Sequence, residues 1–169
     1  MHVYCLFCRT QRCARIAQVL EARGMYRAFS PRILQKKRVQ GVNEKKYTDL
    51  LPGYVFIFNE EKLDNYSAFF GIDGVIRKVG PPDEWYELQG PDREFALQLL
   101  ERDGLVGSTR IVKTGEEVTI EDPLFANNRG MVTKIDYRKE RARVDFVFEG
   151  NECHTWVSLE DVSARPAEE

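Results

Sequence analysis

Histidine, cysteine and long apolar runs are all scarce in this chain of 169 residues. Its two histidines, His2 and His154, are isolated, and no nucleophile–base pair, glycine-rich phosphate loop or pair of catalytic acids is apparent. The sequence therefore predicts a protein that is not an enzyme. No apolar run approaches the roughly 20 residues of a membrane-spanning helix, and the segment before Arg9 and Arg12 lacks the layout of a signal peptide. We expect a cytoplasmic protein.

The four cysteines are too few and too clustered for the disulfide framework of a secreted domain. Cys5 and Cys8 have the C-x-x-C spacing of a metal or redox motif. However, the segment alternates as a strand, which directs the two side chains to opposite faces, whereas the ligands of one metal must converge. Cys153 lies far away in the sequence. We therefore expect buried free thiols, with no metal and no other cofactor.

The net charge of −2 hides an uneven distribution of charge along the chain. Residues 1–46 hold eleven Lys and Arg against two acids, residues 47–104 hold five against twelve, and residues 105–169 hold nine against thirteen. A basic first quarter indicates a surface for phosphate backbones. An ordinary solvated surface would have the same composition, so both interpretations stay open.

Hydrophobic periodicity divides the chain into two parts. Residues 1–104 mix strands (2–8, two around Gly41-Val42-Asn43, 54–58 and 74–80) with helices (about 11–23, about 62–70, and 90 to about 104). This pattern predicts an α+β domain with a mainly antiparallel sheet. Residues 105–114 are the expected linker. From Gly115 the apolar period becomes two, with turns at 127–130, 137–141 and 149–152, which predicts a small all-β barrel over 115–169.

The strand within LLPGYVFIF, residues 50–58, is apolar on both faces. Tyr54, Phe56 and Phe58 point one way, while Val55 and Ile57 point the other. Both faces therefore require cover, either by the domain itself or by a partner.

Several segments together resemble the NusG family of transcription elongation factors. YCLFCRTQ, LLPGYVFIF and GVIRKVG are similar, in order and spacing, to the N-terminal domain of that family. GEEVTIEDPLFANNRGMVTKID is similar to its KOW motif, through Val118, Ile120, Phe125, Gly130 and Val132. The resemblance covers nearly the whole chain. It implies the NusG N-terminal fold followed by a small SH3-like KOW β-barrel.

The resemblance also implies a partner for the apolar strand, namely RNA polymerase. In the family, an apolar cleft receives the clamp helices of the β′ subunit, and the matching residues here are Phe7, Leu51, Pro52, Tyr54 and Phe56. A contact with the gate loop of the β subunit corresponds to Asn65, Tyr66 and Ser67. The alternative is that all the cleft residues are core. We favour the interface for Tyr54 and Phe56, and the core for Val55 and Ile57.

Departures from the general pattern resemble the specialised antiterminator paralogues, the LoaP type first and the RfaH type second. The first strand opens with Val3-Tyr4 and carries two cysteines, and the linker is short. Arg9 keeps a cation where the RfaH type reads the non-template DNA strand, but Val19, Ala22 and Asp73 are unsuited to reading DNA. The resemblance to the LoaP type implies recruitment by a hairpin in the nascent RNA.

The basic residues supply candidates for binding nucleic acid. One set surrounds a hairpin of the second domain, a second flanks the turn near Gly41, and two arginines follow the first strand. The candidates are Arg129, Lys134, Arg138, Lys139, Arg141 and Arg143; Lys36, Lys37, Arg38, Lys45 and Lys46; and Arg9 and Arg12. The bland alternative is a set of soluble hairpin tips, with Arg143 a partner of Glu149.

Two other functions stay open, and a third conflicts with the strand geometry. A general NusG factor would link polymerase to ribosomal protein S10 or to Rho, and Phe125 lies where the family makes that contact. A ribosome-associated KOW protein would bind rRNA, although it leaves the apolar cleft unexplained and such proteins are usually more basic than a chain of pI about 5.8. A thiol redox enzyme conflicts with the opposed directions of Cys5 and Cys8.

Overall fold

The computed structural model describes residues 1–63, 66–69, 71–81, 86–126 and 130–160. The chain divides into two compact units. Unit 1 consists of Met1–Arg32 and Asp49–Gly104, and unit 2 consists of Ile33–Thr48 and the chain from Leu105 onward. Within the described residues, no helix has both the length and the apolar character needed to cross a membrane.

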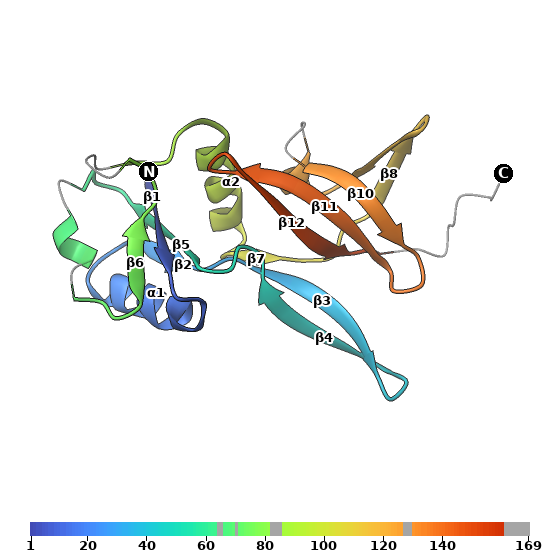
Figure 1. Cartoon of the computed structure of the whole chain (residues 1–169), viewed down its shortest axis with the longest axis horizontal. Coiled ribbons are helices and arrows are strands. Elements are labelled where there is room, and N and C mark those ends of the chain that lie inside the picture. The colour runs from blue at the N-terminus through green and yellow to red at the C-terminus, as the bar shows by residue number, and fades with distance from the viewer. Residues whose placement is uncertain (64–65, 70, 82–85, 127–129, 161–169) are drawn as a thin grey trace. The chain divides into compact units, whose positions relative to one another are not determined.

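Unit 1 is built on an antiparallel sheet of four strands in the order β2-β5-β1-β6 (Figure 1). The strands are β1 (His2–Cys8), β2 (Arg27–Phe29), β5 (Tyr54–Asn59) and β6 (Val75–Lys78). These bounds confirm the strands predicted at 2–8, 54–58 and 74–80. The expected helix at 62–70 is wrong in type, because the described part forms a single 3₁₀ turn, η2 (Tyr66–Phe69).

One face of this sheet is covered by α1 (Cys13–Ala22), which follows the 3₁₀ turn η1 (Thr10–Arg12). Its apolar residues recur at the spacing of one helix face, which forms the predicted stripe. The stripe packs on alternate residues of the strands; the cluster includes Cys13, Ile16, Ala17 and Leu20 with Tyr4, Leu6, Cys8, Val55 and Ile57. Gly24 then takes a φ of +99°, which is the left-handed conformation that favours glycine after a helix.

The second face of the sheet is also buried. Phe56 and Phe58 have no exposed surface, and the ring of Phe29 lies 6.4 Å and 5.2 Å from theirs. The chain around α2 (Gly90–Glu101) approaches this face, since a Cβ on Gly104 would lie 2.6 Å from the ring of Phe29. Leu88 N donates a hydrogen bond to Val3 O at 2.8 Å. The domain therefore covers most of both faces of β5 itself.

Unit 2 contains an antiparallel sheet in the order β10-β11-β12. Its strands are β10 (Gly130–Asp136), β11 (Arg141–Phe148) and β12 (Asn151–Ser158), and β8 (Ile111–Thr114) pairs with β9 (Glu117–Ile120) before the 3₁₀ turn η3 (Pro123–Phe125). Burial alternates along β11, which confirms the predicted period of two. Glu149 and Gly150 have φ of 52° and 74°, so a tight two-residue turn joins β11 to β12, as the sequence predicts.

A third sheet of unit 2 has the order β4-β3-β7. It comprises β3 (Arg32–Val39), β4 (Val42–Asp49) and β7 (Leu105–Val106), and the β3–β4 turn falls at Gln40 and Gly41, slightly earlier than expected. The predicted division assigned this hairpin to residues 1–104 and made 105–114 a linker. Instead, the contacts group residues 33–48 with unit 2, and β7 and β8 occupy much of the expected linker. Sequence order alone could not show that the hairpin packs on a sheet about one hundred residues away.

Candidate functional site

A small aromatic surface lies at one end of the sheet of unit 1. Phe7 of β1 is paired with Tyr54 of β5, and their rings meet edge to face with centroids 5.2 Å apart. Both side chains are partly exposed, and the guanidinium of Arg77 lies 5.3 Å from the centre of the Phe7 ring. A Cβ on Gly53, whose φ is +90°, would lie only 2.9 Å from Phe7, so this close approach requires glycine.

The structure separates the five residues that match the polymerase cleft. Phe7 and Tyr54 are partly exposed and Pro52 is exposed, so these three lie at the surface. Leu51 and Phe56 are 3% and 0% exposed. The interpretation of Phe56 as a surface residue is therefore wrong, because the face that it shares with Tyr54 is covered one pair further along the strand.

The three residues that match the gate-loop contact are only partly described. Asn65 lies outside the described residues, Tyr66 is described only in its backbone at the start of η2, and Ser67 is exposed. Arg23, just after α1, donates from Nη1 to Ala68 O at 2.9 Å. This hydrogen bond fixes η2 against the end of α1.

Unit 2 contains a second candidate, a hollow of about 980 Å³ between the β3–β4 hairpin on one side and the β10–β11 turn with β12 on the other. We call it the basic hollow, because six of its lining residues are Lys or Arg and only Glu140 is acidic. The lining residues are Gln35, Lys36, Lys37, Arg38, Asn43, Thr48, Arg138, Lys139, Glu140, Arg141, His154, Thr155 and Trp156. The hollow thus unites two groups of cations that are about one hundred residues apart in the sequence.

Hydrogen bonds from β3 hold the two sides of the basic hollow together. Gln35 Nε2 donates to Trp156 O at 2.8 Å, and Lys36 Nζ donates to Leu159 O at 2.7 Å. In return, Ser158 Oγ donates to Leu34 O at 2.9 Å. Ile33 and Leu34 are buried. The hairpin is therefore anchored by its base, while its outer residues remain exposed.

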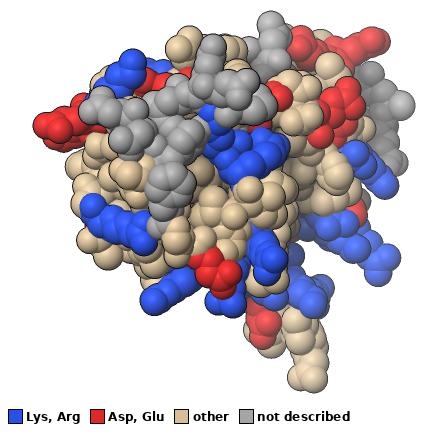
Figure 2. Space-filling view, turned by 60° about the vertical axis from the view of Figure 1, so that its left-hand side comes forward, with Lys and Arg blue, Asp and Glu red and all other residues tan. Residues whose placement is uncertain are grey.

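Four cations of the basic hollow have no charge partner within the described residues. The side chains of Lys37, Arg38, Arg138 and Lys139 are exposed, and they form no hydrogen bond or ion pair with any other described residue. Figure 2 shows Lys and Arg side chains gathered around the hairpin that protrudes lowest in the view. An anionic ligand would relieve their mutual repulsion.

Arg141 and Trp156 form the fixed part of the basic hollow. The Arg141 guanidinium lies 4.0 Å from the centre of the Trp156 ring, and its Nε is 3.8 Å from Asp136 Oδ2. Stacking on the ring orients the guanidinium without removing its charge. Arg141 is among the nucleic-acid residues predicted from the sequence, whereas Trp156, Gln35 and His154 are not. An aromatic residue on the outward face of a strand was the one available signal for Trp156.

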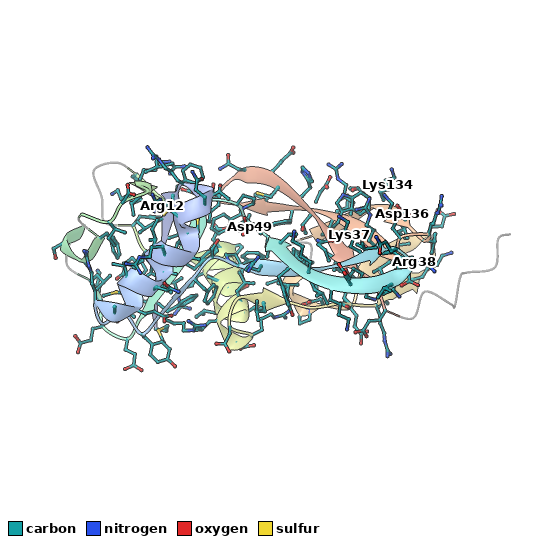
Figure 3. All side chains as sticks on the ribbon, turned by 90° about the horizontal axis from the view of Figure 1, so that it is seen from below. Arg12, Lys37, Arg38, Asp49, Lys134 and Asp136 are labelled. Carbon is teal, nitrogen blue, oxygen red and sulfur yellow. The ribbon has the colours of Figure 1, made fainter. Side chains whose placement is uncertain are left out.

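The other predicted nucleic-acid residues lie outside the basic hollow. Lys45 and Lys46 are exposed on β4, and Lys134 is exposed on β10 near Asp136 (Figure 3). Arg143, a predicted nucleic-acid residue whose alternative partner was Glu149, donates from Nε to Asp145 Oδ1 at 3.0 Å. In unit 1, Arg9 is exposed and Arg12 lies 3.3 Å from Asp73. Arg129 lies outside the described residues.

The residues predicted to form a KOW motif are packed within unit 2. Ile120 and Phe125 are buried, Val118 and Val132 are half-buried, and the Phe125 ring lies edge to face 5.5 Å from that of Phe146. A Cβ on Gly130 would lie 2.8 Å from Val144 Cγ1 and 2.9 Å from Phe125 Cβ, so the motif glycine permits this packing. Phe125 also matches the position of the S10 or Rho contact in the general-factor alternative, and here its ring lies in the core.

The two cysteines of the C-x-x-C segment lie on opposite faces of the sheet, as predicted. Cys8 belongs to the cluster under α1, whereas Cys5 is paired with Phe56 toward the other face. Burial, with a smaller contribution from Cys13, raises the pKa of the Cys8 thiol to about 12. Among the described residues, no group of three or more His, Cys, Asp and Glu could hold a metal ion.

Similarities to known proteins were found at the level of a family model and of a solved structure. The family model described as "Transcription termination factor nusG" matches residues 1–96. A solved structure, "Domain interaction in Thermotoga maritima NusG", matches with 16% identity over 93% of each chain and a TM-score of 0.58. At that identity the likeness shows the fold alone. No curated protein matches the chain.

Proposed function

Because the chain belongs to the NusG family of transcription factors, we propose that it is an elongation factor that binds RNA polymerase and acts as a processive antiterminator on long operons. Proteins of this family generally bind RNA polymerase. A factor that bridges the two sides of the polymerase cleft favours the closed, elongating clamp only to the extent that it binds that state more tightly. No catalytic chemistry is needed for this action, and the protein is not proposed to be an enzyme.

The aromatic surface of unit 1 is the observation that carries the polymerase contact. Phe7, Pro52 and Tyr54 present an apolar surface beside the cation of Arg77. Partly exposed aromatics with fixed rings are typical anchors of protein interfaces. The tips of the β′ clamp helices are the proposed ligand of this surface, and η2 with Ser67 is the proposed contact for the gate loop of the β subunit.

Capture on immobilised bacterial RNA polymerase tests this contact. Tyr54→Glu should reduce capture at least about tenfold, since a charge would be desolvated at the centre of the interface, while the circular dichroism melt stays within a few degrees of the parent. Val147→Glu, at an exposed position of unit 2, is the matched control and should bind as the parent does. A Tyr54→Glu protein that folds and is captured normally would contradict the assignment.

We further propose recruitment by a nucleic-acid element, with nascent RNA favoured over non-template DNA. The support is the basic hollow, whose four unpaired cations suit a phosphate backbone. An RNA element would place the protein with the LoaP type of specialised paralogue, and a DNA element would place it with the RfaH type. In the general-factor alternative, the contact with ribosomal protein S10 or Rho would come from residues other than the buried Phe125 side chain.

A further inference from the structure

The basic hollow has two cationic sides, and side-chain hydrogen bonds between β3 and β12 hold these sides at a fixed separation. Lys37 and Arg38 come from β3, whereas Arg138 and Lys139 come from the β10–β11 turn. The side-chain hydrogen bonds of Gln35 and Ser158 hold β3 against the end of β12. The two sides are thus two halves of one site within unit 2, and neither half alone encloses a ligand.

The charge of the hollow selects an extended polyanion. Four cations lack a partner among the described residues, and Glu140 is the one acidic lining residue. A single small anion could neutralise only part of this charge. A phosphodiester backbone supplies one negative charge per nucleotide, at a spacing that successive cations on two sides can follow.

The volume of the hollow suits a single strand of nucleic acid better than a duplex. Its volume of about 980 Å³ is at the upper end of the roughly 300–1,000 Å³ of sites that enclose one small molecule. A few nucleotides of a single strand fit in such a space, whereas a double helix would contact only its rim. Trp156 and the Arg141 stacked on it add a flat aromatic and guanidinium platform, which suits unpaired bases.

We propose that the basic hollow binds a single-stranded segment of nucleic acid, with Lys37 and Arg38 on one side of the backbone and Arg138 and Lys139 on the other. The proposal deepens the proposed recruitment by nucleic acid and rests on it. It identifies the bound element as the unpaired part, such as the loop of an RNA hairpin, and not as its stem. Gln35 and Ser158 are positioning residues, because they hold the hairpin and carry no charge.

Fluorescence anisotropy with an unstructured oligouridine of about 12 nucleotides tests the proposal. Each neutralised phosphate of a single strand contributes about 0.7 to the slope of log K against log salt, so four contacts predict a slope of about −3. The variants Lys37→Gln/Arg38→Gln and Arg138→Gln/Lys139→Gln should each halve that slope. The control variant Lys45→Gln/Lys46→Gln removes two positive charges from the β3–β4 hairpin, at positions outside the hollow. It should keep a steeper salt slope and a higher affinity than either of the two hollow variants.

Two further arms separate the possible ligands. The same oligomer annealed to its complement should bind several-fold more weakly than the single strand, and a tighter duplex would overturn the proposal. An oligothymidine of equal length presents the same backbone, so whichever single strand binds more tightly identifies nascent RNA or non-template DNA as the source. An equal loss of affinity in the hollow variants and in the control variant would also overturn the proposal, because a diffuse basic surface would then explain the binding.

The positioning role has its own test. Gln35→Ala and Ser158→Ala should each lower affinity several-fold while the salt slope stays unchanged, because no phosphate contact is lost. A changed slope would contradict that role. A variant that combines Lys37→Gln/Arg38→Gln with Arg138→Gln/Lys139→Gln separates this inference from the proposed function, because its capture on RNA polymerase should equal that of the parent. If the duplex binds through these cations, only the single-strand inference fails. If no nucleic acid binds at low salt, the recruitment proposal fails with it.

Discussion

Strand β5 of unit 1 and strand β11 of unit 2 are both rich in aromatic and β-branched residues, yet their surroundings differ. Every residue from Val55 to Phe58 is buried, so β5 is covered on both faces. On β11, buried Ala142, Val144, Phe146 and Phe148 alternate with residues that are at least partly exposed. Strand β5 can therefore offer a partner only its Tyr54 end, whereas β11 keeps one face at least partly exposed along its length.

This difference explains the location of the two candidate surfaces. Along β1 and β5, the partly exposed aromatics are confined to one pair at the end of the two strands, Phe7 and Tyr54. In unit 2 the exposed face carries Arg141 and Trp156 and meets the docked hairpin. An apolar anchor and an electrostatic site thus occupy separate units, and each can be altered without the other.

The largest expected effect comes from Phe56, at the centre of the doubly covered strand. Phe56→Ala should lower the free energy of unfolding by about 3–5 kcal/mol, because a fully buried ring is lost and a cavity remains. Val147→Ala on the exposed face of β11 should change it by no more than about 0.5 kcal/mol. Chemical denaturation followed by circular dichroism measures both. A loss below about 1 kcal/mol for Phe56→Ala would mean that this face is open in solution.

A second comparison concerns the stability cost of adding a Cβ at two glycines of unit 2, one in tight packing and one in open space. Gly130→Ala should lower the free energy of unfolding by about 1–3 kcal/mol, since the new Cβ would lie 2.8 Å from Val144 and 2.9 Å from Phe125. Gly107→Ala is the matched control, because no atom lies within 4 Å of its Cβ and its φ is not positive. Thermal melts of the two variants should differ clearly. Equal melting temperatures would show that the Phe125 packing can yield without loss.

The sequence predicted the elements better than their surroundings. Strand periods, the α1 stripe and the Gly90-Pro91 helix start are local patterns, and the structure reproduces them. The burial of Phe56 depends on Phe29 and on the chain near Gly104, which no local pattern connects. Likewise, the cations at 36–38 and 138–141 were both identified as candidates. Their union in one hollow depends on hydrogen bonds between β3 and the end of β12, which span more than 120 residues.

The smallest expected effect is a difference in thiol reactivity between the two units, because one thiol is buried and the other is partly exposed. Cys8 lies under α1, whereas Cys153 is half-exposed on β12. At pH 8, iodoacetamide should modify Cys153 first, and Cys8 should react only when unit 1 unfolds, because its thiolate is suppressed by a pKa of about 12. Mass spectrometry of the labelled protein measures this order. Early labelling of Cys8 would mean that α1 opens readily.

Because the pKa of Cys8 is raised in the folded protein, the free energy of unfolding should fall as the pH rises. The unfolded thiol, with a pKa near its ordinary value of 9.0, loses its proton before the folded thiol does. The stability contributed by the protonated thiol is therefore complete below pH 9 and declines as the pH rises from 9 toward 12. Cys8→Ala should reduce this decline without removing it, since burial also raises the pKa of Cys13. Denaturant titrations at pH 8 and pH 10 measure the difference. An identical decline in parent and variant would assign it to other groups, whereas a smaller decline in the variant would confirm that a buried thiol of unit 1 responds to pH.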